Sequence, residues 1–261
     1  MAGENGNTKP KVAFFDFTSC EGCQLTVVDS LQKHLDLLDV VEIVNFREAI
    51  SRRDEDYQIA FVEGSCSRPA DEARLRKIRD QAALVVALGA CAHLGGINAI
   101  RNRQPLQDVR RYVYGDKADW YDTYPARPID QVIQVDAIIP GCPIDGEEFI
   151  RSVKMLLQGR IPKFPETPMC VECKLRENVC VYQRGKVCLG PVIRAGCGAI
   201  CPAYGTGCEG CRGLLSEPNM DSLYQVMAEH GLDPTEVEDE LVLFLSYQKV
   251  MHPDGQQSGG K

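Results

Sequence analysis

The chain has 261 residues, of which 44% are apolar and 25% charged, and its formal net charge is −8. This length suffices for one large or two modest domains with real cores, and the negative charge argues against nucleic acid or an anionic membrane as a main partner. No apolar run reaches the roughly 18 residues that indicate a membrane span, and Met1–Pro10 resembles no export signal. The sequence therefore predicts a globular cytoplasmic protein with a disordered tail over residues 1–10.

Residues 11–160 alternate between short apolar runs and longer amphipathic segments. The apolar runs predict strands at Lys11–Phe17, Val40–Phe46, Tyr57–Glu63, Ala83–Leu88 and Ala137–Ile139. Helices are predicted at Gln24–Asp39, Asp71–Gln81 and Asp145–Gln158, and residues 101–130 predict an irregular excursion. In the first helix, the predicted buried stripe consists of Leu25, Val28, Leu31, Leu35 and Leu38. This alternation is typical of an α/β domain with a doubly wound, mostly parallel sheet.

Residues 161–250 are predicted to form a second, small domain with irregular and helical structure. Its first residues, 161–165, read as an extended linker, because each proline disfavours helix at the residue before it. Helices are predicted at Asp221–His230, which Gly231 ends, and from Asp233 to about Val250. Residues 251–261 are polar and predict a second disordered tail.

Eight of the 13 cysteines lie within residues 170–211, where few apolar residues are available for a core, so a bound group is expected to hold this segment folded. They are Cys170, Cys173, Cys180, Cys188, Cys197, Cys201, Cys208 and Cys211. Eight thiolates make two sets of four, which suit tetrahedral zinc or two iron–sulfur clusters. The Cys197-x3-Cys201-Pro202 run is typical of a bacterial ferredoxin and favours iron. Zinc and disulfides remain as alternatives.

The other five cysteines each follow a predicted strand. They are Cys20, Cys23, Cys66, Cys91 and Cys142. Since ligands of open α/β sheets bind at the carboxyl ends of the strands, we expect these thiols to converge, and four of them can hold a third cluster. Spacing alone leaves open whether Cys66 or Cys91 is the fourth ligand. A thioredoxin-like redox pair at Cys20 and Cys23 and a phosphate loop for flavin after the first strand are the alternatives.

The remaining polar residues do not predict a self-contained reaction centre. His93 is interpreted as a turn residue in preference to an iron ligand, and Glu21 and Glu63 as solvated or capping carboxylates. The arginines of the excursion, among them Arg101 and Arg110, predict a solvated or partner-facing surface. Glycines at 89, 95 and 96 are expected to let the backbone approach a bulky cluster.

Several motifs occur in an order that resembles one known family. They are Ser19–Gln24 (SCEGCQ), Val62–Ser65 (VEGS), Gly89–Cys91 with Gly95–Gly96, Pro140–Pro143 (PGCP), Cys188–Pro191 followed by Cys197, and Gly207–Cys211 (GCEGC). This ordered set resembles the small, electron-transfer subunit of nickel–iron hydrogenases over roughly residues 11 to 215. The resemblance implies a flavodoxin-like first domain followed by a small domain with two iron–sulfur clusters.

The resemblance also implies the ligands of three 4Fe–4S clusters. The proximal cluster would be held by Cys20, Cys23, Cys91 and Cys142. The distal cluster would be held by Cys170, Cys173, Cys180 and Cys188. The medial cluster would be held by Cys197, Cys201, Cys208 and Cys211, although the spacing also allows Cys201 to exchange places with Cys180 or Cys188. Cys66 would be a neighbour that binds no iron.

Two departures from the exported members of this family point to its cytoplasmic, bidirectional group. A cysteine, Cys170, stands where those members use a distal histidine, and Cys201 adds a fourth thiolate to a medial site that has three in those members. Such a protein would exchange electrons between the nickel–iron centre of a separate large subunit and an acceptor subunit linked to NAD(P), ferredoxin or deazaflavin. A stand-alone electron carrier and a complex I-like quinone reductase subunit are the alternative functions.

Overall fold

The computed structural model describes residues 9–251, apart from the side chains of residues 234 and 249–251. A five-stranded parallel sheet has the order β2-β1-β3-β4-β5, which is the order of flavodoxin-like folds. Its strands are β1 (Lys11–Asp16), β2 (Glu42–Phe46), β3 (Ile59–Glu63), β4 (Leu84–Leu88) and β5 (Ala137–Ile139). The predicted α/β class and all five strands are therefore confirmed, with bounds that differ by two residues or fewer.

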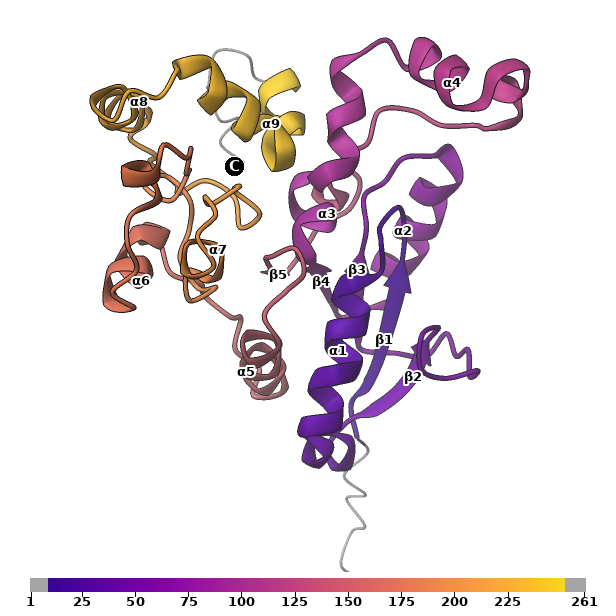
Figure 1. Ribbon diagram of the computed structural model, residues 1–261. Helices are drawn as coiled ribbons and strands as arrows, with labels where there is room; N and C mark the ends of the chain where they lie inside the picture. Colours follow the sequence, from indigo (N-terminus) through magenta and orange to yellow (C-terminus); the bar gives the residue numbers. More distant parts are fainter. Residues whose placement is uncertain (1–8, 252–261) are drawn as a thin grey trace, which may run out of the picture.

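Helices cover both faces of this sheet, and each face has its own core. Helices α1 (Gly22–Lys33) and α5 (Gly146–Leu157) lie against one face, where Phe14 stacks between Phe46 and Phe61 with ring centroids 4.4 and 4.9 Å away. Helix α2 (Pro69–Gln81) buries Leu75 and Ile78 against the other face (Figure 1). Because the strands are covered on both sides, they read in the sequence as continuous apolar runs.

The first helix is shorter than predicted, and its predicted buried stripe is only partly right. Helix α1 ends at Lys33, and residues Leu35–Asp39 form a separate 3₁₀ helix. Val28 and Leu31 are partly buried and pack against the core, whereas Leu25 is 54% exposed and Leu35 63%. The first turn of α1 directs Cys23 and Gln24 inwards, and Val27 follows them at helical spacing, so the buried side of the helix turns away from Leu25.

The segment between residues 101 and 130 is a projecting excursion, as predicted, but much of it is helical. It contains α4 (Leu106–Tyr114), flanked by 3₁₀ helices at Gly96–Arg103 and Gly115–Trp120. Helix α4 stands away from the sheet (Figure 1), and none of its residues is buried. Arg101 and Arg110 are only partly exposed, because they donate hydrogen bonds to the carbonyls of Tyr124 and Ala118 and so hold the excursion together.

The cysteine-rich segment shares an apolar core with the helices on both sides of it. Four helices belong to this part of the chain: α6 (Met169–Leu175), α7 (Ile200–Ala203), α8 (Met220–Glu229) and α9 (Pro234–Met251). Leu189 and Ile193 pack with Leu223 of α8 and Leu241 of α9. The expectation that this segment lacks apolar residues for a core was wrong, because its own Val181, Leu189, Val192 and Ile193 are buried in a core that it shares with α8 and α9.

Helix α9 joins the two parts of the chain. It runs beside α3 (Gly89–Leu94) and the 3₁₀ helix Gly96–Arg103 of the sheet region (Figure 1). Ala90 and Leu94 of α3 belong to the same apolar cluster as Leu245 of α9. The cysteines that follow β1, β4 and β5 are thereby held against the cysteine-rich part of the chain. The predicted domain boundary near residue 160 lies in a segment without regular structure, and the two predicted tails lie outside the described residues.

Candidate metal centres

Four of the five upstream cysteines come together where the strands of the sheet end. Cys20 and Cys23 lie at the start of α1, Cys91 lies in α3 after β4, and Cys142 follows β5. Burial raises the pKa of Cys91 to about 12, and the thiols of Cys142 and Cys20 add to this rise. Burial also raises the pKa of Cys23, with contributions from Cys142 and Cys91. These four residues are called the first cysteine set below.

The raised pKa of Cys23 bears on the alternative of a thioredoxin-like pair. A reactive redox cysteine at a helix N-terminus has a lowered thiol pKa. Cys23 is 7% exposed, and the direction of its pKa shift is the opposite. Buried thiols of this kind become thiolates only when a cation compensates their charge, as a bound metal does. The first cysteine set therefore fits a metal centre better than a redox pair.

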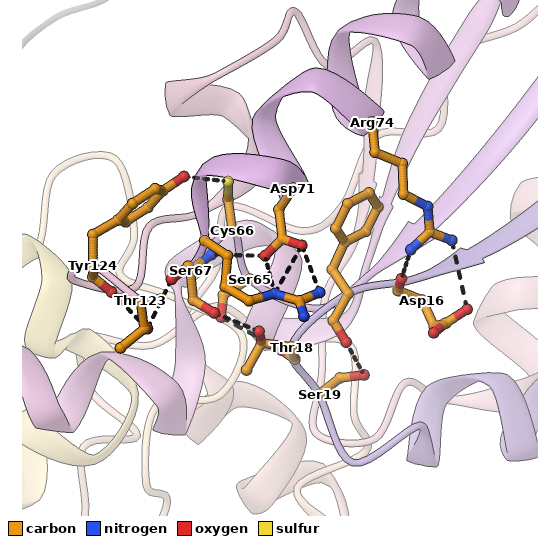
Figure 2. Close-up of polar contacts among 12 residues, drawn as sticks. Asp16, Thr18, Ser19, Ser65, Cys66, Ser67, Asp71, Arg74, Thr123 and Tyr124 are labelled. Atoms are coloured by element: carbon orange, nitrogen blue, oxygen red, sulfur yellow. Dashed lines mark hydrogen bonds and ion pairs between the residues drawn. The ribbon is translucent and has the colours of Figure 1, made fainter. Parts of the chain in front are cut away.

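Cys66 belongs to a different group of residues. Its thiol lies 2.8 Å from the hydroxyl of Tyr124, which donates a hydrogen bond to Glu72 over 3.0 Å. Figure 2 shows this contact next to the hydroxyl groups of Ser67 and Thr18, which are 2.6 Å apart. Burial raises the pKa of Cys66, and the hydrogen bond with Tyr124 lowers it in part. The structure therefore brings Cys91 into the first set, and Cys66 connects the end of β3 to the excursion.

Glu63 holds the N-terminus of α1 in place. The Glu63 carboxylate, 2% exposed at the end of β3, accepts hydrogen bonds from the backbone N–H groups of Cys23 (3.2 Å) and Gln24 (2.9 Å). Helix α1 has no side-chain cap of its own, so this carboxylate from a neighbouring strand performs that role. Of the two interpretations made from the sequence, the capping one fits Glu63.

Replacing Glu63 by alanine is expected to destabilise the site more than the glutamine substitution does. Glu63→Ala leaves two buried N–H groups without acceptors, at about 1–3 kcal/mol for each group, whereas Glu63→Gln keeps one acceptor oxygen. We expect the midpoint of denaturant unfolding to fall in the order wild type, Gln, Ala, with iron content falling in parallel. Equal midpoints for all three proteins would contradict the capping role.

Two glycines allow the backbone to approach the first cysteine set closely. A Cβ atom on Gly89, whose φ is +82°, would lie 2.4 Å from the sulfur of Cys23. One on Gly96 would lie 3.0 Å from the sulfur of Cys91. Gly95 faces Ala99 and Tyr247 and has no contact of this kind with a cysteine, so the expectation for the three glycines holds for Gly89 and Gly96 only.

The eight downstream cysteines separate into two further sets. Burial raises the pKa of Cys170 to about 12, and the neighbouring thiols of Cys188, Cys173 and Cys180 add to this rise. Cys170 and these three cysteines are called the second cysteine set below. The third cysteine set consists of Cys197, Cys201, Cys208 and Cys211. Burial raises the pKa of Cys211 to about 12, and the thiols of Cys197, Cys142 and Cys201 contribute to the rise. Cys201 therefore lies near Cys197 and Cys211.

The third cysteine set surrounds a pocket that reaches the first set. The pocket has an empty volume of about 900 Å³, including its opening to solvent. Cys197, Cys201, Cys208 and Cys211 line it together with Cys142 of the first set. A group bound in this pocket would therefore lie next to the first set.

The cysteines supply thiols that are not joined to one another. Among residues 9–251, no group of three or more His, Cys, Asp or Glu side chains has the geometry of a site for a single ion. All thirteen cysteines are free thiols in this structure. Four cysteine thiolates are the usual ligands of an iron–sulfur cluster.

Gln24 is a buried polar residue next to Cys23. It is 1% exposed, and its side chain bonds to the carboxylate of Glu63, which partly offsets the rise that burial causes in the pKa of Glu63. Two glycines that allow close approach and four neighbouring thiols, of which Cys23 is buried and Cys20 and Cys142 are exposed, together fit an iron–sulfur cluster.

Sequence reasoning did not identify the polar residues that support these sets. Glu172 accepts hydrogen bonds from the N–H groups of Gly196 and Gly198, both over 2.9 Å, and so fixes the loop around Cys197. Arg212 and Glu148 form an ion pair with a shortest distance of 2.7 Å, with side chains 1% and 6% exposed. His93 lies in helix α3 and not in a turn as predicted; it faces Gly213 and Arg194, and burial lowers its pKa to about 4, so its imidazole is neutral.

None of the helices described is both long and apolar enough to span a membrane.

The sequence model of a family described as "NADH ubiquinone oxidoreductase, 20 Kd subunit" matches residues 20–156. The chain is 36% identical over 221 residues to sulfhydrogenase 2 subunit delta of Pyrococcus furiosus, a match that covers 84% of this chain and 92% of that protein. It is 30% identical over 172 residues to the delta subunit of the NAD-reducing hydrogenase HoxS of Cupriavidus necator, covering 60% of this chain and 82% of the relative.

A crystal structure of an NAD⁺-reducing [NiFe]-hydrogenase in the H2-reduced state contains a similar chain. The TM-score is 0.55 at 27% identity, and the match covers 60% of this chain and 96% of that one. The family model ends at residue 156, before the eight downstream cysteines, whereas the sulfhydrogenase relative covers most of the chain. These relatives imply iron–sulfur clusters and an assembly of several subunits. The chain belongs to the family of nickel–iron hydrogenase small subunits, and it is part of an oxidoreductase complex.

Proposed function

We propose that this chain is the electron-transfer subunit of a cytoplasmic nickel–iron hydrogenase and holds three 4Fe–4S clusters. The first cysteine set would hold the proximal cluster, the third set the medial one and the second set the distal one. The observation that supports this proposal is that Cys142 lines one pocket with Cys197, Cys201, Cys208 and Cys211, while the N–H of Cys208 donates to the sulfur of Cys188, so that thiols of all three sets are neighbours. When bound, the clusters supply one-electron transfer between the large subunit and an acceptor subunit.

The residues of this chain tune that chemistry through charge and hydrogen bonding. Each set offers four thiolates and no histidine, and the added negative charge disfavours the reduced state and keeps potentials low. Backbone N–H groups that donate to a ligand sulfur raise the reduction potential. The N–H groups of Cys208 and Gly190 donate to the sulfur of Cys188, and the bond from Cys208 is 3.2 Å long. Low and similar potentials suit reversible exchange of electrons between hydrogen and carriers such as NAD(P), ferredoxin or deazaflavin.

The large subunit, which would carry the nickel–iron centre, is proposed to dock at the first cysteine set and the excursion. Cys20 and Cys142 are exposed there. In the excursion, Tyr112 is 93% exposed and Trp120 74% exposed, and exposed aromatic residues of this kind are enriched in protein interfaces. A stand-alone electron carrier would have no use for such a surface. The acceptor subunit would dock near the second set, where Cys180 is exposed.

Iron analysis of two matched cysteine variants tests the assignment. Cys91→Ala removes a proposed ligand, and Cys66→Ala removes a buried thiol at the same end of the sheet that is proposed to bind no iron. In anaerobically purified protein we expect about twelve iron atoms per chain in the wild type, about eight in Cys91→Ala, and about twelve in Cys66→Ala.

The two variants also separate the ways in which the proposal can fail. Zinc in place of iron would reject clusters altogether. A loss of iron from Cys66→Ala but not from Cys91→Ala would reject the ligand assignment and keep the clusters. Electron paramagnetic resonance of the reduced proteins adds a check, since Cys91→Ala should lose the signal of one cluster.

A further inference from the structure

One buried arginine connects the loops of two cysteine sets. Arg212 directly follows Cys211 and is 1% exposed. Its Nε donates to the carbonyl of Ala195 (2.8 Å), and its Nη1 donates to the carbonyl of Pro140 (3.2 Å). Both guanidinium nitrogens Nη1 and Nη2 also donate to the carboxylate of Glu148 on α5, over 2.7 and 2.8 Å.

The partners of Arg212 are close in sequence to proposed ligands of two different clusters. Pro140 lies two residues before Cys142 of the first set, and Ala195 lies two residues before Cys197 of the third set. One guanidinium group, whose planar fork fixes the direction of each hydrogen bond, therefore holds both loops. Gly196 makes room for it, because a Cβ there would lie 2.1 Å from Nη2.

The two loops meet at a shared pocket. Cys142 of the first set and Cys211, the residue before Arg212, line the same pocket. The third and second sets are linked by a hydrogen bond, in which the N–H of Cys208 donates to the sulfur of Cys188 over 3.2 Å. Within Cys208-Glu209-Gly210-Cys211, one cysteine thus lies next to each neighbouring set.

Stability alone does not account for this ion pair. A buried arginine–carboxylate pair loses the hydration of both charges, and well-packed apolar residues of similar volume are often as stable or more so. What apolar side chains lack is the set of directed hydrogen bonds to Pro140 and Ala195. The geometry therefore indicates that the ion pair positions the loops of Pro140 and Ala195 more than it stabilises the fold.

We propose that Arg212, held by Glu148, is a positioning residue. It fixes the relative position of Cys142 and Cys211, and thereby sets the rate of electron transfer between the clusters of the first and third sets. The proposal rests on the proposed function, because it requires clusters in both sets. It concerns only residues of this chain, and it predicts a change in the coupling between clusters without a loss of iron.

The test uses the complete hydrogenase complex with two kinds of variant. Arg212→Lys keeps the positive charge but loses the planar guanidinium group and its directed hydrogen bonds. The double variant Arg212→Met/Glu148→Leu replaces the pair by apolar residues of similar size, so that it folds without the hydrogen bonds. Arg79→Lys is the matched control, because Arg79 also pairs with a half-buried carboxylate, Asp136, and with the carbonyls of Ala82 and Gln134, away from the cysteine sets.

The readouts are iron content, the magnetic interaction between the reduced clusters by electron paramagnetic resonance, and the rate at which hydrogen reduces the third-set cluster. We expect full iron content in all variants. In both Arg212 variants the interaction between the first-set and third-set clusters should weaken, and the rate should fall about 10- to 100-fold, as when supporting residues of metal sites are changed. The control should match the wild type.

An unchanged interaction and rate in the double variant would overturn the positioning role, as would an equal loss in Arg79→Lys. Loss of iron in the double variant would also overturn it, because the pair would then be needed for cluster binding and not for position. A wild-type complex without iron in the first and third sets would instead reject the proposed function, so the two failures are distinguishable.

Discussion

Cys20→Ala is expected to abolish electron output from the assembled hydrogenase while hydrogen isotope exchange at the nickel–iron centre stays partly intact. Cys20 is an exposed member of the first cysteine set and lies just before α1. Without its thiolate, the proximal cluster loses one of four ligands, and electrons have no route out of the large subunit. Isotope exchange requires proton and hydride transfer at the nickel–iron centre alone, so it does not depend on that route.

To test this prediction, hydrogen-dependent reduction of a dye and hydrogen isotope exchange are measured in the same preparation. Ser19→Ala is the matched control, because Ser19 is the adjacent residue and its hydroxyl makes only a 3.4 Å hydrogen bond to the carbonyl of Phe17. Full dye reduction by Cys20→Ala would reject the proximal assignment. Loss of exchange and of dye reduction together, in the control as well, would indicate disturbed assembly of the two subunits.

Gly89→Ala is expected to remove the proximal cluster through backbone geometry alone. Gly89 has a φ of +82°, where a residue with a Cβ atom costs about 1–2 kcal/mol. The added Cβ would also lie 2.4 Å from the sulfur of Cys23, and the carbonyl of Gly141 at 3.4 Å limits movement in another direction. Cys23 is buried and cannot move aside freely. We therefore expect iron content to fall by about four atoms per chain.

Gly159→Ala separates the two contributions to this effect. Gly159 follows α5, has a φ of +71°, and has no atom within 4 Å of the position of an added Cβ. This variant incurs the backbone cost without the contact with sulfur, so its unfolding midpoint should fall while its iron content stays that of the wild type. Equal iron loss in both variants would show that the overlap with Cys23 is not the cause.

The sequence by itself was sufficient for the strands and for the cysteines. A parallel sheet covered on both faces leaves continuous apolar runs, and these were readable at all five strands. Each upstream cysteine directly follows a strand, so local spacing placed them all at one edge of the sheet. The ordered motifs then indicated the hydrogenase family, which the related proteins confirm.

Only the tertiary structure shows what surrounds each cysteine and which polar residues hold the cysteine loops. Cys66 and Cys91 both follow strands, and only the fold shows that Cys66 contacts Tyr124 while Cys91 lies near Cys20 and Cys142. The predicted stripe of α1 holds for Val28 and Leu31 but not for Leu25 and Leu35, because burial of Cys23 and Gln24 at the sheet edge sets the buried side of the helix. Glu63, Glu148 and Arg212 bond to groups 39 to 72 residues away, and such contacts leave no periodic signal in a sequence. Local sequence patterns determine the secondary-structure elements. The position of a buried charged side chain depends instead on partners that are distant in the sequence and come near only when the chain folds.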